Sequence, residues 1–528
     1  MGYWNLYFAA KLYLAWIGSL RPAWWLNLLF AACLLIPVRH RLLRPLRHLA
    51  ALAAGIALVL HEADLPAPSR ILSQLPALSE FSPGYMLELA GRLVSPSLLW
   101  TVLLVFLAYL LINRWVRVTT FVLGALVAVP LWQGAALLTA RAAPGEPAGT
   151  HARTAAGSPG ANGQPAGSYD EQLAAFRAEQ AERQVDFAPM SADPAAQFDI
   201  IVLHICSLSW DDMDVANLRN HPLLSRFDYV FSNFSSATSY SDPAAIRVLR
   251  ASCGQQAHKD LFSPVPAECH LFAQLAAAGY RAQALLNHDG RYGDFKGIVE
   301  SEIGIPGLQV LPHPDLPVVM REFDGSPLVG DYDALAQWYR NRLSQDGAPV
   351  ALYYNTVTLH DGNRLPDSNL SSLQSYPIRL KTLLDDVDRL IDLIAQSGRK
   401  AAIVFVPEHG AALRGGNNQI AGMREIPTPQ IVHVPVGVKL VGLPAGAQAG
   451  PQPGPVAVDA PTSYVALAQL LSGLVGNSPF QPGAPPLPQY AADLAQTRMV
   501  GENENTVTMA TGNGYVIHTP DDVWLEGK

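Results

Sequence analysis

Apolar residues are concentrated near the start of this 528-residue chain, and their placement constrains the fold more than any other feature. Five apolar runs come before residue 141, at residues 4–20, 23–38, 46–60, 98–112 and 119–140. Crossing a bilayer takes about 20 apolar residues, with roughly 17 as a lower limit. The last run qualifies, the first two nearly do, and the other two are short enough for re-entrant or interfacial helices. We therefore predict an α-helical transmembrane domain of about five spans over residues 1–141.

Charged residues between these runs predict the orientation of the domain. Arg39, Arg41, Arg44 and Arg47 lie in one connection, Arg114 and Arg117 lie in another, and Glu62 and Asp64 mark the opposite side. Because Arg and Lys accumulate in cytoplasmic loops, we expect both basic connections in the cytoplasm. Five spans then place the N-terminus inside and all residues after Ala140 outside. Lys11 lies within the first run and more spans follow, so the pattern is not that of a cleavable signal peptide.

The composition changes twice after the apolar region. Residues 142–167 are rich in Ala, Gly, Pro and Ser, which is typical of a flexible linker, and residues 170–185 predict one short amphipathic helix. We assign residues 142–197 to this linker and helix; the helix lies either on the membrane surface or against the next domain. From residue 198 onward short apolar strands alternate with helices. This alternation predicts an α/β domain over residues 198–528, with a central sheet sandwiched by helices.

The strands and helices of this domain can be placed from their patterns. Residues 198–205, 281–286, 350–359 and 401–406 are predicted strands, and residues 271–278, 380–394 and 463–474 are predicted helices. The helix at 380–394 is the clearest, because its apolar residues recur at helical spacing and Gly398 follows it. A Gly-Asn-Gly sequence at residues 512–514 predicts a hairpin near the C-terminus.

Only four cysteines occur, and three of them lie outside the predicted spans. Cys253 and Cys269 bracket a loop rich in turn residues, and they predict a disulfide bond in an oxidising compartment. Closing a loop of about 15 residues contributes roughly 3 kcal/mol in the chain-entropy model. Cys33 falls within a span, so Cys206 has no partner. It is either buried and inert or protected by a ligand.

Side chains that bind metals follow three of the predicted strands. Cys206 follows the first strand, His360 and Asp361 follow the strand from residue 350, and Glu408 and His409 follow the strand from residue 401. In open α/β sheets ligands gather beyond the carboxyl ends of the strands. A thiolate, a carboxylate and an imidazole suit zinc, and three protein ligands leave a fourth position for a reacting group. The sequence thus predicts a zinc site formed by Cys206, Glu408 and His409.

A nucleophile for such a site is offered by the hydroxyls of residues 237–243. Ser241 precedes Pro243, a residue suited to the first turn of a helix, and the free N–H groups there attract anions such as phosphate. Zinc would lower the proton affinity of the Ser241 hydroxyl and make it an alkoxide for attack on phosphorus. The alternative is that Ser239 and Ser241 only cap the helix.

The segments Ile205-Cys206-Ser207-Leu208-Ser209-Trp210, Ser236-Ala237-Thr238-Ser239-Tyr240-Ser241 and Pro407-Glu408-His409-Gly410 together resemble one known group of enzymes. The chain is similar to the membrane-anchored phosphoethanolamine transferases of the alkaline-phosphatase superfamily, and within them to those that modify bacterial cellulose. The resemblance covers about residues 198–441 and the anchor. It departs from the lipid A enzymes, which use an acidic ligand where Cys206 stands and a threonine nucleophile.

This resemblance implies roles for particular residues. Cys206, Glu408, His409 and Ser241 would bind Zn²⁺, and Ser241 would carry the phosphoethanolamine. His360 would contact the phosphoryl group or donate a proton to the leaving group. Tyr240 is a candidate for orienting the substrate, and Arg424 for gripping a phosphate; both residue types are also common in purely structural or solvated positions.

The resemblance also implies the substrates and the location. The donor would be phosphatidylethanolamine, the acceptor a glucosyl hydroxyl of cellulose, and the partners subunits of the cellulose synthase complex. The chain would lie in the bacterial inner membrane with its alkaline-phosphatase-like domain in the periplasm. The net charge of −8 argues against a nucleic-acid partner. Two alternatives remain: a phosphodiesterase or transferase acting on another envelope glycan or lipid, and a non-catalytic scaffold of a polysaccharide synthase.

Overall fold

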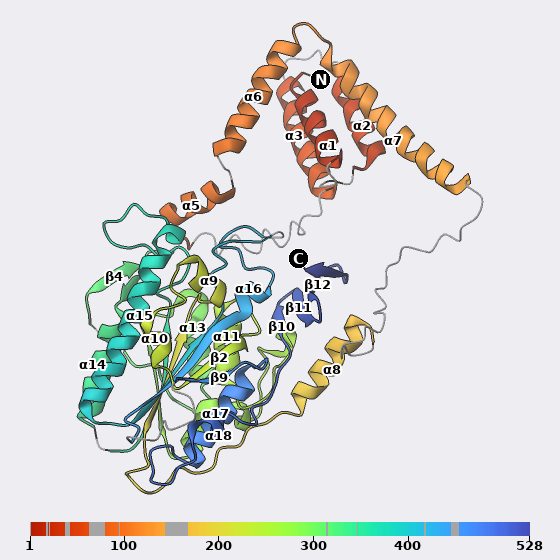
Figure 1. Ribbon diagram of the computed structural model, residues 1–528. Helices are drawn as coiled ribbons and strands as arrows, with labels where there is room; N and C mark the ends of the chain where they lie inside the picture. The colour runs from red at the N-terminus through yellow and green to blue at the C-terminus, as the bar shows by residue number, and fades with distance from the viewer. Residues whose placement is uncertain are drawn as a thin grey trace. The chain divides into compact units, whose positions relative to one another are not determined.

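The computed structural model describes most of the chain and contains two compact units, Met1–Ala152 and Arg153–Lys528 (Figure 1). The described residues are 2–16, 20, 22–36, 43–62, 80–93, 96–142, 167–312, 315–345, 347–416, 419–444 and 454–527. Arg39, Arg41 and Asp64, which we used to predict the orientation, lie outside these ranges. So do residues 143–166, which form most of the predicted linker.

The first unit is helical, as its sequence predicts. Its helices are α1 (Trp4–Trp16), α2 (Trp24–Leu35), α3 (Leu43–Glu62), α5 (Pro83–Leu93), α6 (Pro96–Ile112) and α7 (Val118–Ala142). Phe8, Ala31, Leu34, Ala51, Val122 and Leu126 form a small buried core. No helix in the described part of the chain combines the length and the hydrophobicity that a bilayer crossing requires. The five spans therefore stay a prediction.

The second unit is built on a seven-stranded sheet with the order β3-β6-β1-β7-β8-β2-β9. The strands are β1 (Asp199–Ile205), β2 (Tyr229–Ser235), β3 (Arg281–Leu286), β6 (Val350–Thr356), β7 (Ala401–Pro407), β8 (His433–Val441) and β9 (Val456–Val458). Only β8 runs antiparallel to its neighbours. The parallel strands β1, β6 and β7 are buried along their whole length, which explains their unbroken apolar sequences.

Helices cover both faces of this sheet, and this confirms the predicted α/β sandwich (Figure 1). Along β1, Ile200 and Val202 face one core cluster, and Ile201 and Leu203 face the other. The helices are α9 (Trp210–Val215), α10 (Pro222–Arg226), α11 (Ser241–Leu249), α12 (Leu271–Ala277), α13 (Phe295–Glu302), α14 (Asp331–Leu343), α15 (Ser372–Ser397), α16 (Pro429–Val432), α17 (Tyr464–Gly476) and α18 (Leu487–Tyr490). Three single-turn 3-10 helices lie at His258–Asp260, Ala267–Cys269 and Tyr292–Asp294.

Two smaller sheets complete the unit. A hairpin joins β4 (Val318–Arg321) to β5 (Pro327–Val329), and the C-terminal sheet contains β10 (Val500–Asn503), β11 (Thr506–Thr511), β12 (Gly514–His518) and β13 (Trp524–Gly527). The turn between β11 and β12 confirms the hairpin predicted at residues 512–514.

The amphipathic helix that we assigned to the linker is α8 (Tyr169–Ala181). It begins at a capping box formed by Ser168 and Glu171. Its apolar face packs on the C-terminal sheet, where Leu173 and Phe176 join the buried side chains of β10, β11 and β12. Of the two placements left open by the sequence, the structure thus shows packing against the α/β unit.

Cysteine pairing follows the sequence-based expectation. A disulfide bond joins Cys253 and Cys269, with their Cα atoms 4.8 Å apart. Cys206 is a free, fully buried thiol at the end of β1, and Cys33 is free and exposed. The position of Cys206 makes it the first residue of the candidate site.

Candidate metal centre

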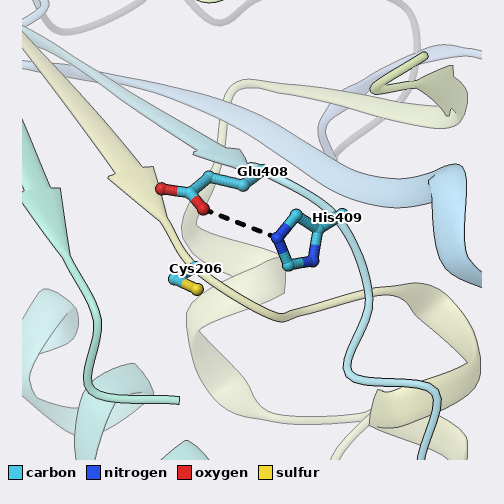
Figure 2. A group of neighbouring side chains, drawn as sticks. All are labelled: Cys206, Glu408 and His409. Atoms are coloured by element: carbon cyan, nitrogen blue, oxygen red, sulfur yellow. Dashed lines mark ion pairs between the residues drawn. The ribbon is translucent and has the colours of Figure 1, made fainter. Parts of the chain in front are cut away.

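Three side chains of the types that bind metals converge where β1 and β7 end (Figure 2). Ile205 pairs with Pro407 in the parallel register, so Cys206 and Glu408 leave the sheet side by side. One ligand atom from each of Cys206, Glu408 and His409 lies within 4.8 Å of the others, and all three side chains are buried. Within the described residues no other group of three His, Cys, Asp or Glu side chains meets this distance criterion.

The imidazole of His409 is oriented for metal binding. Its Nδ1 lies 3.0 Å from the Gly410 carbonyl oxygen. Because a carbonyl can only accept, and because the contact of this nitrogen with Arg424 Nη1 is longer at 3.4 Å, Nδ1 carries the proton and Nε2 keeps its lone pair. In the described structure this buried Nε2 has no hydrogen-bond partner, and it lies 3.7 Å from Oε2 of Glu408. An unpaired buried nitrogen is costly, so a ligand at this point would relieve the cost.

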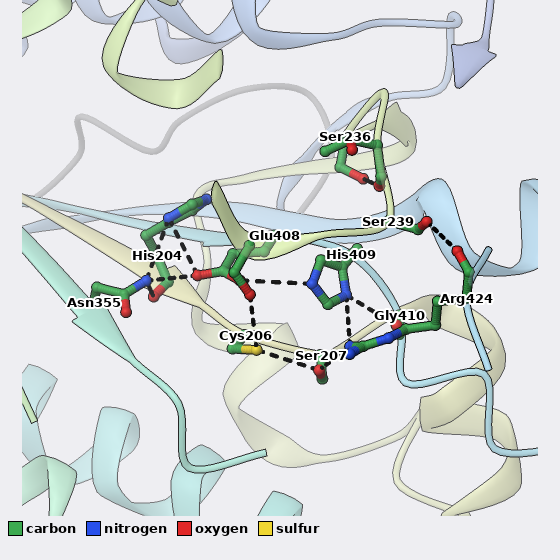
Figure 3. A network of polar contacts seen from close by, with 12 residues as sticks. His204, Cys206, Ser207, Ser236, Ser239, Asn355, Glu408, His409, Gly410 and Arg424 are labelled. Atoms are coloured by element: carbon green, nitrogen blue, oxygen red, sulfur yellow. Dashed lines mark hydrogen bonds and ion pairs between the residues drawn. The ribbon is translucent and has the colours of Figure 1, made fainter. Parts of the chain in front are cut away.

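Polar side chains behind Glu408 hold its carboxylate in place (Figure 3). Asn355, on β6, donates from Nδ2 to Oε1 of Glu408 at 2.6 Å. His204 Nδ1 lies 3.6 Å from the same oxygen. Burial raises the pKa of Glu408 to about 7, because the charged form loses its water, and hydrogen bonds such as that from Asn355 oppose this rise only in part. Burial likewise raises the pKa of the Cys206 thiol, and the Glu408 carboxylate adds to this rise.

The donor set fits zinc. One sulfur, one imidazole nitrogen and one carboxylate oxygen are ligands of tetrahedral zinc sites, and three protein ligands are typical of sites with an open position. A divalent cation would also stabilise the charged forms of Cys206 and Glu408, which burial alone disfavours. The raised pKa values and the unpaired Nε2 of His409 thus have a common explanation in a bound cation.

Ser241 lies beside this cluster as the first residue of α11. Its Oγ is 3.5 Å from the Cys206 sulfur. Tyr240 is the N-cap residue, and the helix has no side-chain cap; Ser239 instead donates its hydroxyl proton to the Arg424 carbonyl. Neither serine therefore caps the helix. The Ser241 hydroxyl is left facing the metal-binding side chains from the N-terminal end of α11.

Arg424 reaches the same region from the loop before α16. Its Nη1 donates to the Ser207 hydroxyl at 2.9 Å, and its guanidinium carbon lies 6.0 Å from the centre of the Tyr240 ring. Burial raises the pKa of Tyr240, and the carboxylate of Glu425 adds to the rise. Tyr240 is therefore neutral near pH 7 and acts as an O–H donor rather than as a charge.

His360 is half-buried beyond the end of β6. Its Nδ1 lies 2.6 Å from the Asp361 carbonyl oxygen, and its ring packs 4.8 Å from that of Phe323. Burial and the positive charge of Arg424 lower the pKa of His360 to about 4. The ring is thus neutral near pH 7, with the proton on Nδ1 and a free lone pair on Nε2. The buried guanidinium of Arg379 fixes the turn, because its Nη1 donates to the carbonyls of Thr358 at 2.6 Å and His360 at 3.1 Å.

A buried carboxylate clamps the two ligand-bearing loops together. Asp212 accepts hydrogen bonds from the backbone and hydroxyl of Ser209, at 2.9 and 2.8 Å, in the loop after Cys206. It also accepts one from Ala411 N at 2.7 Å, in the loop after His409. Gly410 is required here, because a Cβ at this position would lie 2.6 Å from the Ser209 hydroxyl. The two loops are thereby fixed at one spacing.

A second clamp connects the nucleophile loop with the Arg424 loop. Asn503, the last residue of β10, donates from Nδ2 to the Ser239 hydroxyl at 2.7 Å and to the Glu425 carbonyl at 3.0 Å. Its Oδ1 accepts from Ser239 N at 3.3 Å. The C-terminal sheet thus contributes directly to the position of the residues just before Ser241.

Comparison with known proteins identifies the family. The family model of the cellulose biosynthesis protein BcsG C-terminal domain matches residues 154–524, and that of the BcsG N-terminal domain matches residues 4–131. The chain belongs to the BcsG family. It is 36% identical to the cellulose biosynthesis protein BcsG of Salmonella typhimurium strain LT2 over 531 residues, covering 97% of this chain and 94% of that protein. The BcsG of Escherichia coli K12 is also 36% identical, with 96% and 92% covered.

Similarity to solved structures is weaker. An alkaline phosphatase superfamily protein from Vibrio parahaemolyticus gives a TM-score of 0.46 at 14% identity, covering 68% of this chain and 87% of that one. The zinc complex of the C-terminal periplasmic domain of EcEptC from Escherichia coli gives a TM-score of 0.43 at 14% identity, covering 64% and 97%. These values are too low to transfer residue roles to the BcsG family.

For this BcsG-family chain, all the predicted metal ligands and Ser241 lie together, and Arg424 and Tyr240 lie beside them. Sequence reasoning missed Asn355, Asp212 and Asn503. Asn355 is an amide within an apolar strand, a visible signal that was not used. Ser209 and Asp212 have the spacing of a capping box, which predicts the cap but not the bond to Ala411. Asn503 gives no local signal, because its partner Ser239 is 264 residues away.

Proposed function

We propose that the chain is a zinc-dependent phosphoethanolamine transferase with a covalent Ser241 intermediate. The observation that carries this proposal is the group of three buried zinc-type donors with a serine hydroxyl 3.5 Å from the sulfur. Cys206, Glu408 and His409 would hold the ion, and Ser241 would take the open position. Zinc, when bound, would lower the proton affinity of the serine hydroxyl and stabilise charge that develops on the phosphoryl oxygens.

The transfer would proceed in two half-reactions. In the first, a bond forms between Ser241 Oγ and phosphorus, the bond from phosphorus to the diacylglycerol oxygen breaks, and the serine proton passes in net to that oxygen. In the second, an acceptor hydroxyl attacks phosphorus, the bond from phosphorus to Ser241 Oγ breaks, and the acceptor proton returns in net to Ser241. His360 Nε2 would accept a hydrogen bond from the attacking hydroxyl and orient it, because Nδ1 holds the proton. Arg424 would contact the phosphoryl oxygens with donors not used by Ser207.

The donor would be phosphatidylethanolamine in the bacterial inner membrane. We propose that residues 1–141 anchor the chain there through about five spans and that residues 198–528 lie in the periplasm. The apolar runs support the anchor, as do exposed apolar side chains on α6, where Leu99, Trp100, Leu104 and Leu111 are each more than half exposed. The disulfide between Cys253 and Cys269 supports an oxidising compartment.

The acceptor would be a glucosyl hydroxyl of cellulose, and the partners would be subunits of the cellulose synthase complex. Membership of a family named for cellulose biosynthesis supports this assignment. The same site chemistry would serve a phosphodiesterase, for which water replaces the sugar.

Product analysis separates these functions. The full-length protein is incubated in detergent micelles with phosphatidylethanolamine and a cello-oligosaccharide, and phosphorus products are followed by NMR. We expect phosphoethanolamine on the sugar, and no product after zinc is chelated. Free phosphoethanolamine, formed equally without sugar, would indicate a phosphodiesterase. No turnover together with no bound zinc would indicate a scaffold and would refute the transferase.

A further inference from the structure

A second polar site lies near the C-terminal end of α11, away from Ser241. A groove of about 460 Å³ runs between the end of α8 and the loop closed by the Cys253–Cys269 disulfide. A small inner cavity of about 20 Å³ adjoins it, and both are lined by Gln180, Arg250 and residues 253–256. Arg247, which lines the inner cavity, is six residues after Ser241, or about 9 Å along the helix axis. None of the residues that line the groove or the inner cavity belongs to the candidate metal centre, so the two places are separate.

The inner cavity collects buried polar atoms that have no partner. Nε and Nη2 of Arg247, Nε2 of Gln180 and the hydroxyl of Tyr464 make no hydrogen bond in the described part of the chain. These three side chains are only 5%, 2% and 5% exposed, and all three line the cavity. Leaving such buried groups unpaired destabilises the fold, so a partner there is favourable. A cavity of this size admits only one or two water-sized groups, so a water molecule or a single ligand hydroxyl fits beside these side chains.

Charged and amide side chains are among the residues that line the outer groove, and their charges balance. Its charged lining residues are Arg177, Arg183, Arg250, Glu182, Asp260 and Glu268, three of each sign. Four glutamines, Gln180, Gln184, Gln255 and Gln256, add amide groups that both donate and accept. A phosphate or another anion would gain little from a groove whose charges cancel. A neutral ligand with many hydroxyl groups matches it, because each hydroxyl both donates and accepts.

We propose that this groove binds a stretch of the β-glucan acceptor and that one sugar hydroxyl enters the inner cavity. The acceptor's identity rests on the proposed function. The guanidinium of Arg247 and the amide of Gln180 donate to the hydroxyl oxygen, and Tyr464 can either donate or accept. The groove would hold one part of the glucan away from Ser241, while another part of the same glucan reaches the reacting site. The groove residues would therefore not contact the phosphoryl group. Acceptors long enough to occupy both places bind better than short ones.

Binding of cellohexaose to the full-length protein, measured by calorimetry in detergent micelles, tests this inference. Tyr464→Phe removes an oxygen that has no protein partner, so the fold is kept, and we expect binding about 3- to 10-fold weaker, the worth of one hydrogen bond. Ala181→Arg places a large side chain in the groove from an exposed position and should weaken binding more than 10-fold. The matched control is Ala395→Arg at an exposed position on α15, which should bind cellohexaose like the wild type.

The outcomes are separable from those of the transferase proposal. Formation of a Ser241 adduct from donor lipid needs no acceptor and is measured on the same wild-type preparation. Glucan binding without an adduct would uphold the groove and refute the transferase. An adduct without cellohexaose binding, or equal binding by Tyr464→Phe, Ala181→Arg and wild type, would overturn the groove. Inorganic phosphate that binds and displaces cellohexaose would show an anion site and would also overturn it.

Discussion

The two ends of strand β1 both meet a buried carboxylate, but among the described residues an arginine pairs with the carboxylate at only one end. At its start, Asp199 Oδ1 accepts from Arg342 Nη2 at 2.9 Å and from Val350 N at 2.8 Å. At its other end the Cys206 thiol and the His409 imidazole meet the Glu408 carboxylate, and no Lys or Arg side chain forms an ion pair with that carboxylate within the described residues. A buried charge paired by the protein itself is a structural element. A thiol, a carboxylate and an imidazole that converge without a cationic side chain indicate a cation site, whereas the Asp199–Arg342 pair is structural.

Removing one of the predicted zinc ligands at the Cys206 end of β1 should have the largest effect on metal binding and transfer. Glu408→Gln keeps the size of the side chain but loses a charged donor, and we expect zinc content to fall close to zero and transfer to be lost. Elemental analysis of the purified protein measures the metal. Wild-type zinc content in Glu408→Gln would show that the convergence is not a metal site.

Removing Arg342, which pairs with Asp199 at the start of β1, should instead lower the stability of the α/β unit. Arg342→Met leaves the Asp199 carboxylate buried without its main partner, and we expect the free energy of unfolding of the α/β unit to fall by about 3–5 kcal/mol. Urea titration followed by fluorescence measures this change. Zinc content of the folded protein should stay at the wild-type value. Loss of zinc with unchanged stability would reverse the roles that we assign to the two ends.

The clamp between the two ligand loops should give a smaller effect. In Asp212→Asn an amide nitrogen replaces one of the two accepting oxygens, so at least one N–H of Ser209, Ala411 or Leu413 loses its acceptor. We expect zinc affinity to weaken about 10- to 100-fold, as for other residues that orient ligands. Competition with a chelator measures the affinity. Unchanged affinity would mean that the loops keep their spacing without Asp212.

The Asn503 clamp should have the smallest effect and should not change metal binding. Asn503→Ala removes the bonds to Ser239 and Glu425 but leaves the three metal-binding side chains in place. We expect kcat to fall about 10-fold, the scale of a modest misplacement of the nucleophile, with zinc affinity unchanged. A parallel fall in zinc affinity would show that Asn503 stabilises the whole site rather than the nucleophile loop.

The sequence predicts the sheet and the ligand positions for a common physical reason. Strands β1 and β7 are apolar without interruption because both faces are buried, so their ends are sharp and Cys206 and Glu408 stand out. The strand predicted at residues 350–359 ends earlier, at Thr356, because Thr358 turns to bond Asp331. The local apolar pattern carries no information about a hydrogen bond between residues 27 positions apart, so it does not predict where this strand ends.

Helix α15 shows the same limit. Its apolar periodicity predicts residues 380–394, whereas it spans Ser372–Ser397. The first two turns bury Ser372, Ser375 and Arg379, whose hydrogen bonds position the His360 turn. Polar residues that are buried because they hydrogen-bond the turn at His360 interrupt the apolar pattern. They are therefore the part of the helix that sequence periodicity misses.

Intact-mass analysis of the protein after incubation with phosphatidylethanolamine tests the central claim most directly. We predict that the zinc-loaded wild type gains one phosphoethanolamine group, and that Ser241→Ala and the chelated wild type gain none. Peptide mapping should place the group on Ser241. An adduct on Ser241→Ala, or an undiminished adduct after complete removal of zinc, would contradict the account of Cys206, Glu408, His409 and Ser241 as one phosphotransfer site.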